Sequence, residues 1–242
     1  MIETTINGNI VYTDDTYTHR WLDAIGPDVC KLIEEFVNVP FSATDQMAGW
    51  LATLIENGAG ESTVSMVAGS PGGEVIFKTD ENDNDGINAQ LLGEAFYLAS
   101  RYPTYFGARF KVADADQTDL AIGLCISDTT VLAGVSDGLY FRLVDESSTL
   151  TLVAEKGNAE TIIGLATLAD GGYVTAEYTY LNNLITAYIN GVQVGQISDA
   201  DPNFPDTEYL TPTIAILAGA AAAGTGKTLT MDWIKAIQVQ TV

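Results

Sequence analysis

The chain has 242 residues, of which 47% are apolar and 17% charged, with 32 acidic and 10 basic side chains and a formal charge of −22. This size and hydrophobicity exclude intrinsic disorder as a class, and the acidic excess excludes nucleic acid as a partner because a phosphate backbone would be repelled. No segment approaches the roughly 20 continuous apolar residues of a membrane span, and the start is not typical of a signal peptide.

The first forty residues differ in pattern from the rest. Asn7-Gly8 lies within a β-like alternation and is a hairpin-type pair. Residues 27–40 predict one short amphipathic helix, with Pro27 at the first helical position and Pro40 at its end. Its apolar face, at helical spacing, consists of Val29, Leu32, Ile33, Phe36 and Val37. We predict an N-terminal arm and helix over 1–40 and a separate domain over 41–242.

Two roles remain open for this N-terminal segment. Its apolar face could cover the open end of its own domain, as most amphipathic helices do. It could instead serve assembly by clasping a neighbouring subunit. In the second case the partner-binding residues are Trp21, Val29, Leu32, Ile33 and Phe36.

From about residue 50 the sequence consists of short β-like segments separated by turn-rich connections. The clearest hairpin spans residues 184–197, where Asn190-Gly191 suits the positive φ angles of a type I′ turn. About a dozen strands with short connections predict an all-β protein. The expected architecture is a sandwich of two antiparallel sheets or a jelly roll.

Two short motifs match the sequence patterns of a nucleotide-binding loop and of a serine-hydrolase nucleophile. Ala221–Thr228 fit a nucleotide-binding pattern, which requires a helix to follow, but Leu229 and Met231 continue an alternating strand pattern. Gly134–Gly138 fit G-x-S-x-G, yet a strand pattern follows Ser136 and the single histidine, His19, lies far upstream. We predict neither a nucleotide cofactor nor a serine hydrolase.

The acidic residues indicate one weak metal candidate and no catalytic pair. Residues 79–86, TDENDNDG, make Asp80, Asp83 and Asp85 a calcium candidate, although a solvated hairpin turn is the favoured interpretation. Glu155 and Glu160 flank a turn, and Glu177 is isolated. We therefore predict no catalytic residues and no cofactor. Two further residues, Cys30 and Cys125, fit no metal spacing and are expected to be buried free thiols in a protein made in a reducing cytoplasm.

From about residue 47 onward the chain resembles the concanavalin A-like, laminin-G-like jelly-roll sandwich. The resemblance lies in YFGARFKV (105–112), DGLYFRLV (137–144) and the closing MDWIKAIQV (231–239). The last segment is similar to the terminal strand of laminarinase-type members of this superfamily. Those enzymes carry E-x-D-x-x-E on a central strand, and this sequence lacks it. The resemblance therefore implies the fold without the hydrolase activity.

The ordered motifs are still more similar to a group of tailed-phage virion proteins. They read GWLATLIENGAGEST, YFGARFKV, GLCIS, DGLYF, INGVQVG, NFPDTEYLTP and MDWIKAIQ. The resemblance implies a non-enzymatic head decoration or cement protein on the outer surface of the capsid, made in the host cytoplasm. Its expected partners are the major capsid protein and further copies of itself, as a dimer or trimer.

Two other functions stay open. One is a carbohydrate-binding, lectin-like module of a phage fibre or tail that contacts host-surface glycans. An exposed aromatic platform near calcium ligands would favour that reading. The other is a glycosidase, which requires a carboxylate pair in a groove.

Overall fold

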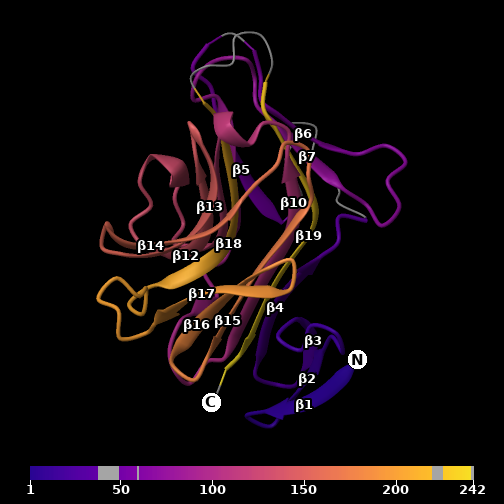
Figure 1. Ribbon diagram of the computed structural model, residues 1–242, viewed down its shortest axis with the longest axis vertical. Coiled ribbons are helices and arrows are strands. Elements are labelled where there is room, and N and C mark those ends of the chain that lie inside the picture. The colour runs from indigo at the N-terminus through magenta and orange to yellow at the C-terminus, as the bar shows by residue number, and fades with distance from the viewer. Residues whose placement is uncertain (38–48, 59, 220–225, 241–242) are drawn as a thin grey trace.

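The computed structural model describes residues 1–37, 49–58, 60–219 and 226–240. Two large antiparallel sheets form a sandwich, and a small sheet of β1 (Ile2–Ile6), β2 (Asn9–Thr13) and β3 (Trp21–Ile25) lies beside it (Figure 1). The predicted all-β sandwich is confirmed. In the described ranges the helical elements are two 3-10 turns, η1 (Ala115–Gln117) and η2 (Val131–Ala133), and no helix has the length and hydrophobicity to cross a membrane.

Sheet I is the layer on which the N-terminal sheet lies. Its strand order is β17 (Val192–Ser198), β16 (Leu184–Ile189), β15 (Val174–Leu181), β10 (Thr104–Val112), β19 (Thr228–Val239), β7 (Val75–Lys78) and β6 (Thr63–Met66). An eighth strand, β4 (Val29–Glu34), pairs with the second half of β19, beyond the segment that pairs with β7. Strand β19, near the C-terminus, thus pairs with β4, near the N-terminus.

Sheet II is the opposite layer of the sandwich. Its strand order is β14 (Ala159–Thr167), β13 (Ser147–Lys156), β12 (Gly138–Val144), β11 (Thr118–Cys125), β18 (Tyr209–Ala218), β8 (Gly86–Leu91) and β5 (Trp50–Ile55). A two-residue strand, β9 (Phe96–Tyr97), pairs with the start of β18. Strand alternation on β12 directs Leu139, Phe141 and Leu143 into the core and leaves Tyr140 and Arg142 on the outer face.

An aromatic cluster lies in the middle of the sandwich core. The ring of Phe106 on β10 lies 5.2 Å from that of Tyr178 on β15 and 6.4 Å from that of Phe141 on β12. All three side chains are completely buried, so each contributes roughly 1.5–3 kcal/mol through removal of apolar surface from water. These contacts join sheet I to sheet II.

The hairpin turns follow the local sequence. Asn190 and Gly191, between β16 and β17, have φ angles of 50° and 82°, and Asn7 and Gly8, between β1 and β2, have 48° and 80°. Asparagine and glycine adopt this left-handed conformation at the lowest steric cost, which is why the turn positions could be predicted.

The predicted helix at 27–40 is wrong, because residues 29–34 form β4 and pair with Ile234–Val239 of β19. The alternation of half-buried Leu32 with exposed Ile33 is that of a strand at a sheet edge. Phe36 then adopts a φ of 50°, which ends any regular structure, and its buried ring joins the main core. The expected boundary at residue 40 lies outside the described residues.

The N-terminal sheet packs on the outer surface of sheet I through a small apolar cluster. Trp21 stacks on Tyr105 with ring centroids 6.3 Å apart and an interplanar angle of 15°. Val11 and Ala24 are buried in the same cluster, together with Ile237 of β19. The segment that the sequence predicts as an arm is therefore folded against its own domain.

A buried carboxylate stabilises the contact between the N-terminal sheet and sheet I. Glu177, fully buried on β15, accepts hydrogen bonds from Arg20 Nε and Nη2 at 2.6 and 2.8 Å and from the Tyr105 hydroxyl at 2.8 Å. His19 Nε2 lies 3.3 Å from the same carboxylate, and its ring stacks on Tyr188 at 3.6 Å. We call these five residues the Glu177 cluster.

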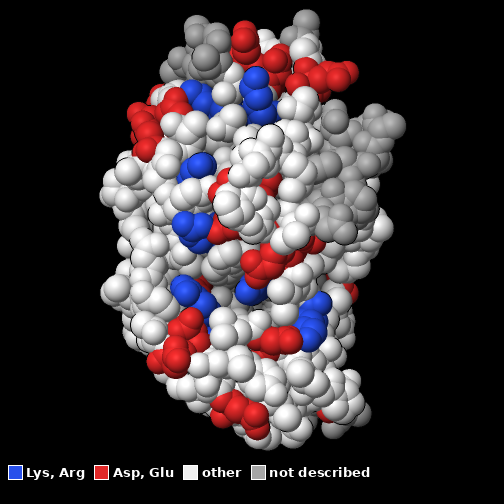
Figure 2. All heavy atoms as spheres, turned by 90° about the vertical axis from the view of Figure 1, so that its right-hand side faces the viewer, with Lys and Arg blue, Asp and Glu red and all other residues white. Residues whose placement is uncertain are grey.

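Basic and acidic side chains are interspersed on the face of the molecule that Figure 2 shows. On sheet I, Arg109 pairs with Asp232, and Lys31 of β4 pairs with Asp23 of β3 at 2.6 Å. In each pair an acidic side chain lies beside the basic one, and the basic residues on this face do not form a continuous patch.

Candidate functional site

The outer face of sheet II carries two pockets, separated by the loop of residues 126–137. Val131 and Val135 of this loop pack on Ala121, Tyr140 and Val153, and so fix the loop across the middle of the sheet. A pocket of about 200 Å³ lies over β12, β13 and β14 and is called the Glu155 pocket. One of about 150 Å³ lies over β5 and β8 and is called the Asn88 pocket.

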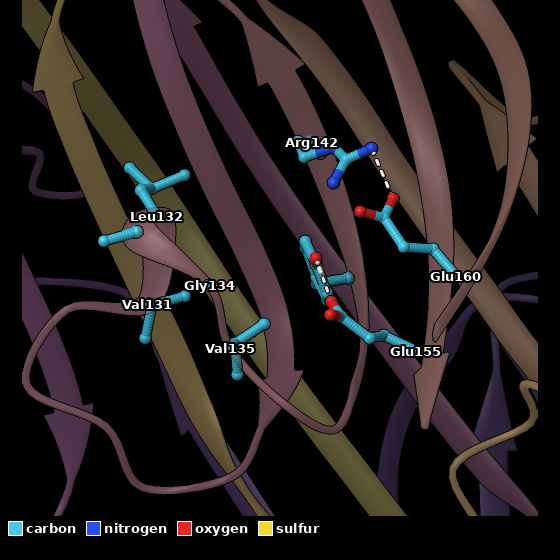
Figure 3. Close-up of a pocket in the computed structure, with 9 residues that line it drawn as sticks. Val131, Leu132, Gly134, Val135, Arg142, Glu155 and Glu160 are labelled. Carbon is cyan, nitrogen blue, oxygen red and sulfur yellow. Dashed lines mark hydrogen bonds and ion pairs between the residues drawn. The ribbon is translucent and has the colours of Figure 1, made fainter. Parts of the chain in front are cut away.

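Polar side chains form one wall of the Glu155 pocket, and the η2 segment forms the other (Figure 3). The Tyr140 hydroxyl donates to Glu155 Oε2 at 2.6 Å, and Arg142 Nη2 donates to Glu160 Oε2 at 2.7 Å. Glu155 and Glu160 are direct cross-strand partners on β13 and β14, so their side chains share one face. The hairpin thus places on one face two carboxylates that the sequence shows only as flanking a turn.

The two carboxylates lie in different environments. Glu155 is only 5% exposed, and this burial raises the pKa of its carboxyl group against the opposing hydrogen bond from Tyr140. Glu160 is more exposed and is held by the guanidinium of Arg142. Arg142 Nε is itself buried and has no hydrogen-bond partner in the described part of the chain. The pocket lining therefore combines two carboxylates with the guanidinium group of Arg142.

The Asn88 pocket contains a buried hydrogen-bond acceptor without a partner among the described residues. Asn88 is buried, and its Nδ2 donates to the carbonyl of Asp128, but its Oδ1 has no partner within the described ranges. Gln90 accepts from Asp128 N at 2.8 Å and donates to Ile126 O at 3.0 Å. These amides hold the loop in place and leave one buried acceptor unused, which is costly unless a ligand or solvent satisfies it.

The predicted partner-binding residues do not lie at these pockets. Trp21 and Phe36 are buried within their own chain, Val29 and Leu32 are half-buried, and Ile33 is 37% exposed. Contact between these residues and a partner stays a prediction.

The weak calcium candidate consists of Asp80, Asp83 and Asp85, for which a hairpin turn was the favoured interpretation. Asp85 is buried and accepts hydrogen bonds from Asn57 N at 2.5 Å and from Asn82 N and Nδ2 at 3.2 and 2.8 Å. Asp80 and Asp83 do not join Asp85 in a group that could hold a metal ion, among the residues the structure describes. The carboxylate of Asp85 holds two loops together, because N–H donors surround it where a cation would need oxygens.

Another acidic group does converge, near the nucleotide-like motif. Oxygens of Asp114, Asp116 and Asp170 lie within 4.8 Å of one another, and the ammonium of Lys227 pairs with Asp114. Thr228 begins β19, so a strand follows the motif, as predicted; residues 221–225 of the motif lie outside the described residues. Lys227 is thus a buried partner of an aspartate, in a setting without the helix that a phosphate site requires.

The G-x-S-x-G motif also has the predicted surroundings. Gly138 begins the strand β12, and His19 contacts Glu177 on sheet I instead of Ser136. The two cysteines are free; Cys125 is buried and Cys30 is half-buried.

No family model matches the chain, and no curated protein sequence matches it. Among solved structures, an endo-1,3-beta-glucanase from Streptomyces sioyaensis is 11% identical, with a TM-score of 0.59 over 90% of this chain and 99% of that one. A protein of unknown function from Shewanella oneidensis MR-1 is 17% identical, with a TM-score of 0.57 over 88% of each chain. The potassium-bound carbohydrate recognition domain of Emp46p is 15% identical, with a TM-score of 0.55 over 81% and 90%.

Identities this low establish the fold alone. The architecture is a concanavalin A-like jelly roll, the fold of these glucanases and lectin domains. The expectation drawn from residues 105–112, 137–144 and 231–239 is confirmed at the level of the fold.

Proposed function

We propose that this chain is a non-enzymatic, lectin-like module that binds glycans on the outer face of sheet II. The Glu155 pocket carries the proposal, because two carboxylates, a tyrosine hydroxyl and a guanidinium line a volume of about 200 Å³. A sugar hydroxyl donates and accepts hydrogen bonds at once, so it matches such a mixed lining. The names of similar structures, a glucanase and a carbohydrate recognition domain, support the same ligand class.

We propose that the chain binds glycans without hydrolysing them, although Glu155 and Glu160 form a carboxylate pair in the pocket. Two carboxyl groups can catalyse glycoside hydrolysis when one donates a proton and the other attacks or activates water. Here the Tyr140 hydroxyl occupies Glu155, and the Arg142 guanidinium occupies Glu160. These contacts leave both carboxylates with further acceptor positions for a ligand, and the E-x-D-x-x-E sequence of the laminarinase-type enzymes is absent.

Glu155→Gln is expected to weaken glycan binding at least tenfold, because a carboxylate acceptor is lost while a side-chain oxygen still receives the Tyr140 hydroxyl. The measurement is titration of the strongest ligands from a glycan array, with melting temperature as the check of folding. Glu81→Gln, the same charge change at an exposed position, should bind like the wild type. Equal binding by wild type and Glu155→Gln would contradict the proposal, and release of reducing sugar would contradict its non-enzymatic part.

A virion role is the second candidate, and the N-terminal sheet favours it. This sheet lies outside the sandwich and exposes apolar side chains, including Ile25 at 55%, and one edge of β1 pairs with no strand among the residues that the structure describes. Such an edge can accept a strand or an apolar surface from another protein. In this role the partners are the major capsid protein and further copies of the chain, as a dimer or trimer, on the outer surface of the capsid. The lectin-like role would instead place the chain on a fibre or tail.

Ile25→Asp tests the virion role without removing any strand. If the N-terminal sheet binds a capsid lattice, cryo-electron microscopy of undecorated phage heads mixed with wild-type protein should give density at every equivalent position. The substitution should abolish that density because a charge would be buried at the contact. Leu92→Asp, at an exposed position just after β8 of the opposite sheet, should decorate like the wild type. Clean heads with wild-type protein would exclude this role.

A further inference from the structure

A cluster of tyrosines lies at one end of the sandwich. Tyr97 and Tyr209 are direct cross-strand partners where β9 pairs with β18, and their rings lie 5.0 Å apart at 42°. The ring of Tyr102 meets Tyr97 edge-on at 6.3 Å. Tyr209 is 57% exposed, although a large aromatic side chain gains from burial. The cluster therefore offers an aromatic surface to solvent.

A pocket of about 230 Å³ opens beside this cluster. Its lining includes the rings of Tyr97, Tyr180 and Phe204 and the carboxylates of Asp199 and Asp206. It shares no lining residue with the Glu155 pocket. Aromatic walls with a few convergent polar groups are typical of small-molecule sites.

Ordinary contacts hold both carboxylates in position. The Tyr180 hydroxyl donates to Asp199 Oδ2 at 3.0 Å, and Lys156 Nζ pairs with Asp206 Oδ1 at 2.6 Å. An ionised carboxylate has about four acceptor positions, so one such contact leaves capacity for further donors. The polar groups of the pocket are thus pre-positioned acceptors.

The geometry points to a second glycan site here, one that binds a single pyranose ring. The apolar C–H face of the sugar would stack on Tyr209, because partly positive C–H bonds are attracted to the negative face of an aromatic ring. Its hydroxyl groups would donate to Asp199 and Asp206. The segment 203–212, NFPDTEYLTP, supplies Phe204 and Asp206 of the pocket lining, and it also supplies Tyr209, whose ring packs on the lining residue Tyr97. This inference stands independently of the Glu155 pocket.

Saturation-transfer difference NMR tests the inference with four probes: the methyl glycosides of glucose, galactose and mannose, and N-acetylglucosamine. At least one probe should receive saturation, most strongly at the C–H protons of one ring face. The signal should fall at least fivefold in Tyr209→Ala, where the stacking surface is lost, and in Asp199→Asn, where an anionic acceptor is lost. Tyr12→Ala, a half-buried tyrosine on β2, should keep the signal.

The controls separate this site from the Glu155 pocket and from misfolding. The side chain of Tyr209 is 57% exposed, so Tyr209→Ala should keep the wild-type melting temperature and amide spectrum. Absence of saturation transfer to all four probes would overturn the inference. A signal that survives Tyr209→Ala and Asp199→Asn but disappears in Glu155→Gln would assign binding to the Glu155 pocket and would overturn it equally.

Discussion

Glu177→Gln is expected to lower the free energy of unfolding by about 3 kcal/mol or more and to loosen the N-terminal sheet from sheet I. The carboxylate is fully buried and accepts hydrogen bonds from Arg20 and Tyr105. Without its negative charge, the partly buried guanidinium of Arg20 would lose its counter-ion. A buried ion pair broken at one partner is strongly destabilising because the remaining charge stays uncompensated.

The same cluster predicts how stability depends on pH. Burial by itself raises the pKa of Glu177, but hydrogen bonds from Arg20 and His19, the charge of Arg20 and the Tyr105 hydroxyl lower it from 4.5 to about 2. Since the folded pKa lies below the unfolded one, this stabilisation is complete above pH 4.5 and is lost as the pH falls towards 2. A shift of this size corresponds to about 3 kcal/mol.

Urea unfolding of the wild type and Glu177→Gln at several pH values measures both effects. The difference between the two proteins should shrink between pH 4.5 and 2, where the wild-type carboxylate becomes protonated. Limited proteolysis should cut Glu177→Gln first between β2 and β3, the connection that carries His19 and Arg20. Glu3→Gln, an exposed glutamate in the same small sheet, should behave like the wild type. Equal stability of Glu177→Gln and wild type at neutral pH would disprove the anchoring role.

Gly123→Ala is expected to destabilise the fold by about 1–3 kcal/mol and to abolish binding in the Glu155 pocket. Gly123 on β11 lies directly opposite Tyr140 on β12. A Cβ at this position would come within 3.0 Å of Tyr140 Cα and of the Leu139 carbonyl oxygen, which are backbone atoms that cannot rotate away. Strand β12 would have to shift, and the shift would carry Tyr140 away from Glu155.

The matched control is Gly164→Ala on β14 of the same sheet. There the nearest atom to an added Cβ is Thr149 Cγ2 at 3.9 Å, an ordinary contact, so stability and binding should stay near the wild type. Thermal unfolding and the glycan titration described for Glu155→Gln provide both readouts. Wild-type stability in Gly123→Ala would show that the sheet can accommodate the methyl group and would contradict the expected effect.

Local rules predicted the features that depend on adjacent residues. Asn190-Gly191 and Asn7-Gly8 form the expected turns because their φ preferences are intrinsic to those residue types. The strand after Lys227 and the strand after Ser136 were predicted from alternation alone. The prediction of a helix over 27–40 was wrong, because the same apolar residues are compatible with a short strand. The edge with which this strand pairs belongs to β19, about 200 residues later in the sequence.

The Glu155 pocket could have been predicted in part. A two-residue turn at Gly157-Asn158 makes Glu155 and Glu160 cross-strand partners, so their shared face follows from the hairpin rule. The position of Tyr140 and Arg142 beside them depends on the pairing of β12 with β13, which is still a neighbouring hairpin. Val131 and Val135 reach the pocket only because the loop of residues 126–137 folds back over β11 and β18. No local sequence pattern predicts this fold of the loop.

By itself the sequence determined the all-β class, the tight turns and the rejection of the two short motifs, because these depend on residue preferences and on a period of two along a strand. Tertiary structure alone decided the place of Trp21 in a buried cluster, the convergence of Arg20, Tyr105 and Glu177, and the pairing of Tyr97 with Tyr209. These contacts join residues far apart in the sequence. Tyr105 and Glu177 are 72 positions apart, and Arg20 and Glu177 are 157 positions apart. Contacts of this range follow from the packing of whole sheets, which periodicity within one segment does not specify.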